Sequence, residues 1–92
     1  MLRRRRKQET AHWYRDLKES NACMDCGSFF HHASMEFDHM PGSIKETEVS
    51  ELVRKETSRR WIIAEMEKCE LVCANCHAVR TFNRSRGVAQ PG

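Results

Sequence analysis

Apolar residues recur at helical spacing near the start of the chain. Ala11, Tyr14 and Leu17 lie three residues apart beside Trp13, a spacing that predicts a short amphipathic helix running from Gln8 to about Ser20. The apolar side chains of such a helix pack against the rest of the protein, so we expect this helix to lie on the core.

A different period follows in the segment MEFD at residues 35–38. Met35 and Phe37 alternate with Glu36 and Asp38, the pattern of a half-buried strand. We expect a β-hairpin across about residues 28–40, because Pro41 and Gly42 then end the strand.

Helical spacing returns between residues 43 and 68. One apolar group is formed by Val49, Leu52 and Val53, and a second begins at Trp61 and Ile62 after Ser58, a residue type that often caps a helix at its start. The pattern leaves open whether this is one helix or two. The run CELVC at 69–73 predicts a short strand, and residues 74–83 predict a helix.

The size and composition of the chain limit its core. It has 92 residues, 39% of them hydrophobic and 32% charged, with seven aromatic residues (two Trp, one Tyr and four Phe). A domain this small usually needs disulfides or a bound metal for stability. Mixed helical and strand patterns therefore predict a small metal-stabilised α+β domain.

Five cysteines are candidates for that metal site, and four of them form two pairs. Each pair has two intervening residues, and the first is followed by Gly27, which lets the backbone turn around the sulfur atoms. Two such turns complete a tetrahedral Zn²⁺ site, so we expect a structural zinc ion. A redox pair, as in a thiol-disulfide oxidoreductase, or another metal is the alternative, although the βαβ context of a thioredoxin-like motif is missing. The proposed zinc ligands are Cys23, Cys26, Cys73 and Cys76.

Cys69 is left over from the two pairs. It could be an alternative ligand or a redox sensor. We interpret it instead as a small, partly apolar residue buried on the strand that precedes the second pair.

Charge divides the chain into three parts. Residues 1–18 contain seven Lys and Arg against two acids, residues 19–70 contain six against eleven, and residues 71–92 contain three against none. Basic ends suit phosphate binding, although a basic tail can also serve only solubility. We divide the chain into a flexible basic arm (1–7), a single domain (8–84) and a flexible tail (85–92).

No apolar run is long enough to cross a membrane, and the start of the chain lacks the apolar region of a secretory signal. We therefore expect a cytoplasmic protein without a membrane partner. Closely paired cysteines in such a reducing compartment favour metal binding over structural disulfides.

Three polar residues need to be placed relative to the two cysteine pairs, Cys23/Cys26 and Cys73/Cys76, which we call the first and second zinc knuckles. Asp38 and His39 end the predicted hairpin, and His77 follows the last cysteine. A zinc ion that joins both knuckles would bring Asp38 and His77 together, where a carboxylate and an imidazole can share a divalent cation. His39 would then be free to accept a proton from an attacking water, a combination that hydrolyses phosphodiesters.

This arrangement has one geometric requirement. Neighbouring residues of a regular strand face opposite ways, so Asp38 and His39 can serve one site only if the strand ends or bulges there. Pro41 and Gly42 favour such an ending. Without it, His39 is an ordinary surface or core histidine.

The segments CMDC, FDH and LVCANCH, followed by AVRT, resemble the His-Asn-His (HNH) endonuclease family in order and spacing, over about residues 23–81. The resemblance is to a small phage-like member with a four-cysteine zinc site. It implies a treble-clef-like ββα-metal (His-Me finger) fold, with Asp38 and His77 as ligands of a catalytic divalent ion, Mg²⁺ or Mn²⁺, and His39 as the general base. For a phage-encoded member the resemblance implies a role in phage DNA processing or packaging in the host cytoplasm, with DNA and phage packaging proteins as the expected partners.

The sequence departs from that family at its middle asparagine, which orients the catalytic histidine through the loop backbone. Lys68 occupies that position, and Asn75, inside the second knuckle, is the alternative. A catalytically inactive zinc module that binds nucleic acid or protein is therefore the second hypothesis. The first is a DNA endonuclease that nicks as a monomer.

Several cationic residues could bind DNA phosphates. Because phosphate contacts carry no sequence information, the DNA binding they support would be weakly specific and strongly salt dependent. Two further histidines, His31 and His32, could be extra metal or phosphate ligands, or exposed hairpin residues; His12 is given no role. The predicted DNA contacts are Arg3, Arg4, Arg5, Arg6, Lys7, Arg80 and Arg84.

Overall fold

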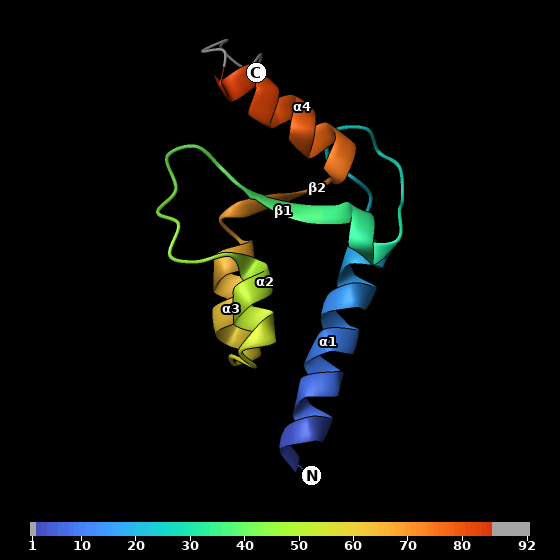
Figure 1. Ribbon diagram of the computed structural model, residues 1–92, viewed down its shortest axis with the longest axis vertical. Helices are drawn as coiled ribbons and strands as arrows, with labels where there is room; N and C mark the ends of the chain where they lie inside the picture. Colours follow the sequence, from blue (N-terminus) through green and yellow to red (C-terminus); the bar gives the residue numbers. More distant parts are fainter. Residues whose placement is uncertain (1, 86–92) are drawn as a thin grey trace.

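A two-stranded antiparallel sheet lies at the centre of the fold, and its strands are far apart in the sequence (Figure 1). The computed structural model describes residues 2–85. Strand β1 (Met35–His39) pairs with β2 (Cys69–Cys73), with Met35 opposite Cys73 and His39 opposite Cys69. The predicted hairpin across residues 28–40 is therefore wrong: β1 pairs with the CELVC segment, because that segment supplies the apolar partners.

Helix α1 (Leu2–Ser20) is longer than the sequence pattern predicts. It ends where expected but begins six residues before Gln8, so the backbone of the basic run is helical and continuous with α1. Arginine and lysine have high helix propensity, and no proline or glycine interrupts the run. Residue 1 of the predicted arm lies outside the described residues.

Residues 43–68 form two helices, α2 (Val49–Arg54) and α3 (Arg59–Met66). They are separated by Glu56, whose φ of 59° lies in the left-handed region that ends a helix. Ser58 occupies the N-cap position of α3 as predicted, although its side chain makes no capping hydrogen bond.

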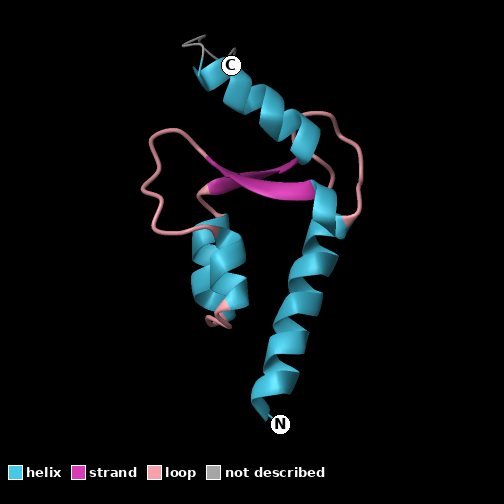
Figure 2. Ribbon diagram, viewed as in Figure 1, coloured by secondary structure: helices cyan, strands magenta, loops and turns pink. Residues whose placement is uncertain are grey.

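The helices cover the sheet from two sides (Figure 2). Helix α4 (Ala74–Ser85) lies on one face, and α1, α2 and α3 lie on the other. Alternate residues of β1 therefore meet different helices: Asp38 contacts α4, whereas Phe37 stacks on Tyr14 of α1 at 6.1 Å between ring centroids. The remainder of the predicted tail, residues 86–92, lies outside the described residues.

The buried core lies beside the sheet and is small. One cluster consists of Cys23, Met35, Val72 and Cys73, and Val49 of α2 and Ile62 of α3 are also buried. The domain is thus a small α+β domain in which two of the predicted zinc ligands are core residues. No helix in residues 2–85 combines the length and apolar character needed to cross a membrane.

Candidate metal centre and acid-histidine site

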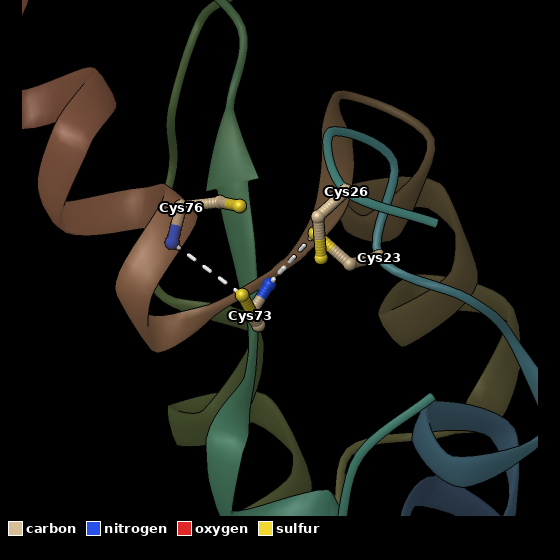
Figure 3. A group of neighbouring side chains, drawn as sticks. All are labelled: Cys23, Cys26, Cys73 and Cys76. Carbon is tan, nitrogen blue, oxygen red and sulfur yellow. Dashed lines mark hydrogen bonds between the residues drawn. The ribbon is translucent and has the colours of Figure 1, made fainter. Parts of the chain in front are cut away.

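The four paired cysteines meet at one end of the sheet (Figure 3). Their sulfur atoms all lie within 4.8 Å of one another. In a tetrahedral site with Zn–S bonds of about 2.3 Å, neighbouring sulfurs are about 3.8 Å apart, so a small adjustment suffices for all four to bind one ion. The cluster of Cys23, Cys26, Cys73 and Cys76 therefore fits the predicted zinc ion.

The first knuckle is a tight turn held on β2. Cys23 N–H donates to the Ser28 carbonyl at 2.9 Å, and Gly27 N–H donates to the Cys23 carbonyl at 2.8 Å. Gly27 has a φ of 74°, which glycine adopts at little cost. Met24 N–H donates to the Leu71 carbonyl of β2 at 2.9 Å. This bond attaches the first knuckle to the strand that carries Cys73.

The second knuckle is the junction between β2 and α4. Cys73 is the last residue of β2, and Cys76 lies in the first turn of α4. Backbone amides face the sulfurs: Cys73 N–H donates to Cys23 Sγ at 3.3 Å, and Cys76 N–H donates to Cys73 Sγ at 3.4 Å (Figure 3). Such N–H···S bonds favour the thiolate forms that a zinc ion requires.

Electrostatics in the cluster also suit a cation. Burial raises the pKa of Cys23, but hydrogen bonds from the backbone of Cys26 and Cys73 outweigh it and bring the pKa down to about 6. The hydrogen bond to Cys73, followed by burial and the other nearby sulfurs, raises the pKa of Cys76 to about 12. A divalent ion stabilises all four thiolates together, because it supplies the positive charge that their mutual repulsion demands.

Cys69 stands apart from this cluster, at the start of β2. Burial, together with the charges of Glu65 and Asp38, raises the pKa of Cys69 to about 11. Its thiol donates to the Glu65 carbonyl at 3.4 Å. Partial burial and a high pKa make it a poor nucleophile, in agreement with the interpretation of Cys69 as a packing residue on the strand.

Asp38 and His77 are brought together across the sheet and α4. Asp38 Oδ1 lies 3.5 Å from His77 Nε2. Ligands of one metal ion with bonds of about 2.1 Å lie about 3 Å apart when adjacent, so the two atoms are close to the separation that a shared ion needs.

The Asp38 carboxylate already has partners. It is buried, and it accepts hydrogen bonds from Arg80 Nη1 at 2.8 Å and from both terminal nitrogens of Arg84 at 2.9 Å. Burial raises the pKa of Asp38, but the bonds from Arg84 and Arg80 outweigh burial and hold that pKa below its usual range. A metal ion at Asp38 would have to take oxygens that the arginines now bind.

Two of the arginines predicted to bind DNA, Arg80 and Arg84, form ion pairs with carboxylates within the domain. Arg80 pairs with Asp25, Asp38 and Glu70 at 2.7 to 2.8 Å, and its side chain is only 11% exposed. Arg84 pairs with Asp38 at 2.9 Å. In this conformation their charges are neutralised within the protein. The side chains of Arg3 to Lys7 lie outside the described part of the chain.

Glu36 joins this site and was not identified from the sequence. Its Oε1 lies 2.6 Å from His77 Nδ1. Glu36 is two residues before Asp38, on the same face of β1, so the alternation that defines the strand could have placed it beside α4. A hollow of about 500 Å³ between Glu36 and α4 adjoins His77, and a second hollow of about 270 Å³ extends from Glu36 and His77 to residues of α1 and α2.

His39 lies on the other face of the sheet. The strand neither ends nor bulges at Asp38, because both residues belong to the regular ladder with β2. His39 Nε2 instead lies 2.7 Å from Oε2 of the buried Glu65 on α3. The structure therefore brings Asp38 and His77 together but does not bring His39 to them.

Lys68 is part of the His39 environment. Its Nζ donates to Glu65 Oε1 at 3.1 Å and to the Ile44 carbonyl at 2.9 Å, so it connects α3 to the loop that follows β1. Burial raises the pKa of Glu65, but the bonds from His39 and Lys68 outweigh it and lower that pKa. Asn75, the alternative to the family asparagine, is an exposed residue of α4.

No protein-family model, curated protein or solved structure matches the chain.

Proposed function

We propose that the protein is a metal-dependent DNA endonuclease of the HNH type, in which β1, β2 and α4 form a ββα-metal motif on a treble-clef-like zinc scaffold. One observation carries the proposal: Asp38 Oδ1 and His77 Nε2, which come from distant parts of the chain, lie 3.5 Å apart. Carboxylate and imidazole together suit Mg²⁺ or Mn²⁺ only weakly but leave positions open for water and phosphate. When bound, the ion would stabilise charge on the phosphate and on the departing 3′ oxygen.

The residues around this pair have separate tasks in the proposal. Glu36 accepts from His77 Nδ1–H, which leaves Nε2 free to act as a ligand. Without the ion, Arg84 forms an ion pair with the Asp38 carboxylate. When the ion binds, Arg84 would leave that carboxylate and bind a DNA phosphate instead. The exchange keeps Asp38 paired with a cation throughout.

His39 is the proposed general base. Glu65 binds its Nε2 and so leaves Nδ1 to accept a proton. Lys68 bonds both to Glu65 and to the Ile44 carbonyl, and we propose that it replaces the family asparagine in tying the histidine to the loop. The end of β1 must bend for His39 to face the Asp38 side. The glycine after Pro41, Gly42, has a φ of 90° and lies where such a bend could begin.

A second function has specific support. His39 faces away from Asp38 and His77, and Asp38 is neutralised by two arginines. Both features are expected of a zinc-stabilised module that binds nucleic acid or protein but catalyses no reaction.

Under either function the basic run at residues 3–7 would bind DNA phosphates. The affinity for DNA should therefore fall steeply as the salt concentration is raised from about 50 to 200 mM.

A plasmid-relaxation assay separates the two functions. The zinc-loaded protein is incubated with supercoiled plasmid in Mg²⁺, Mn²⁺ or EDTA, together with the variants His39→Ala, Asp38→Asn and His77→Ala. We expect metal-dependent nicking that falls at least 100-fold in each variant, because each removes a ligand or the base.

His12→Ala is the matched control, since His12 is an exposed histidine on α1 far along the chain from the site. It should nick like the parent protein. DNA binding by the parent without nicking in any metal would establish the non-catalytic module instead. Nicking retained in Asp38→Asn and His77→Ala would remove this pair from the active site.

A further inference from the structure

A second group of metal-ligating side chains lies outside both sites described above. One ligand atom from each of Glu19, His31 and His32 can be chosen so that all three lie within 4.8 Å of one another. The two imidazole rings are 4.1 Å apart between centroids. We propose that these three residues form a surface site for a transition-metal ion, distinct from the four-cysteine centre and from Asp38 and His77.

Local structure holds the three residues together. Glu19 is in the last turn of α1, and His32 begins a short 3₁₀ helix, η1 (His32–Ser34). Glu19 Oε2 accepts a hydrogen bond from His32 N–H at 2.9 Å, which joins the two elements. The first zinc knuckle, Cys23 to Cys26, lies between these two elements in sequence.

The charges around the site favour a cation. Glu19 places a carboxylate at the C-terminal end of a helix, where the helix dipole is negative and a bound cation is stabilising.

Binding at His31 has a defined cost. Its Nδ1 accepts a hydrogen bond from Ala33 N–H at 3.1 Å. That bond is lost whichever ring nitrogen binds the metal, because ligation at Nδ1 displaces Ala33 and ligation at Nε2 moves the ring proton to Nδ1. Three protein ligands, one of which must give up a hydrogen bond, predict a moderate affinity and leave open positions for water or another ligand.

The donor set determines the class of metal. Two imidazoles and one carboxylate suit Zn²⁺, Ni²⁺ or Cu²⁺, whereas Mg²⁺ and Ca²⁺ prefer oxygen ligands alone. The site therefore differs in preference from a Mg²⁺ site at Asp38 and His77. The inference does not depend on nuclease activity.

Calorimetric titration with NiCl₂ tests the site. The full chain is first loaded with one equivalent of zinc, which occupies the four thiolates, and is then titrated at pH 7.5. We expect a Ni²⁺ binding event whose affinity is reduced at least tenfold in His31→Ala and in His32→Ala. Paramagnetic broadening of NMR signals should be centred on Glu19 and residues 31–34.

Two variants make the test specific. His12→Ala controls for an exposed histidine on α1 outside the cluster, and His77→Ala controls for nickel at the Asp38 site. Both should retain the Ni²⁺ binding event that His31→Ala and His32→Ala weaken. Absence of Ni²⁺ binding by the folded, zinc-loaded parent would overturn the proposal, as would loss of binding in His77→Ala with retention in His32→Ala. Circular dichroism verifies that each variant is folded.

Discussion

Asp38 accepts three hydrogen bonds from two arginines while only 4% of its surface is exposed. Charge-assisted hydrogen bonds are stronger than neutral ones, and removing one partner of a buried pair leaves the other without compensation. The sequence predicted the meeting of Asp38 and His77 from the cysteine spacing. It did not predict the arginine pairs, because a guanidinium one turn after His77 could equally face solvent.

We expect Asp38→Asn to destabilise the fold by about 2 to 4 kcal/mol, since the amide keeps the shape but loses the charge. Because the pKa of Asp38 is lowered in the fold, its stabilising contribution is present above the unfolded pKa of about 3.9 and is lost as the pH falls through the folded pKa. Urea unfolding should therefore show the full difference between the zinc-loaded parent and the variant at about pH 7, where Asp38 is ionised and the thiolates hold the zinc ion.

The matched control is Asp16→Asn. Asp16 is exposed on α1 and makes no ion pair within the described residues. Its substitution should change stability by less than about 0.5 kcal/mol. Equal stability of the parent and Asp38→Asn at neutral pH would show that the buried pairs contribute nothing.

Among the elements, α1 shows how a helix is attached to a sheet this small. Tyr14 stacks on Phe37 of β1 and carries Lys18 over its ring at 4.6 Å. The apolar spacing predicted this packing face. The pairing of β1 with β2 was missed because sequence rules favour a nearby partner, whereas the actual partner follows two helices and is held by the cysteine knuckles.

Tyr14→Ala tests that attachment. It removes the half-buried Tyr14 ring and its stacking contact with Phe37, so we expect a loss of about 2 to 3 kcal/mol of stability. The amides of α1 should also exchange hydrogen faster than those of α4, because α1 loses its contact with the sheet. Arg15→Ala, at the neighbouring exposed position, is the control and should leave both measurements nearly unchanged. Unaltered exchange in Tyr14→Ala would mean that other contacts hold α1.

At the scale of the whole molecule, the buried apolar core is small, so stability depends strongly on the zinc site. Cys23 and Cys73 are two of the four residues in the core cluster next to the sheet. The zinc site was predictable from the spacing of the cysteines alone, since that spacing fixes the ligand geometry. The placement of His39 was not, because the regular ladder continues through it and the partner Glu65 lies on a separate helix.

Zinc should therefore determine whether the chain folds. The apparent binding free energy of a structural zinc ion is about 10 to 16 kcal/mol, similar to the whole stability of a small domain. We expect Cys73→Ser to be unfolded by circular dichroism and to contain no zinc by elemental analysis. Treatment of the parent with a strong chelator should have the same effect.

Cys69→Ser is the control that separates zinc ligation from the loss of a buried thiol. Cys69 lies four residues before Cys73 on the same strand, and a serine there can still donate to the Glu65 carbonyl. This variant should bind one zinc ion and lose about 1 kcal/mol or less. If Cys73→Ser remained folded without zinc, the apolar contacts of the core would suffice by themselves, and the knuckles would no longer explain how Asp38 and His77 come together.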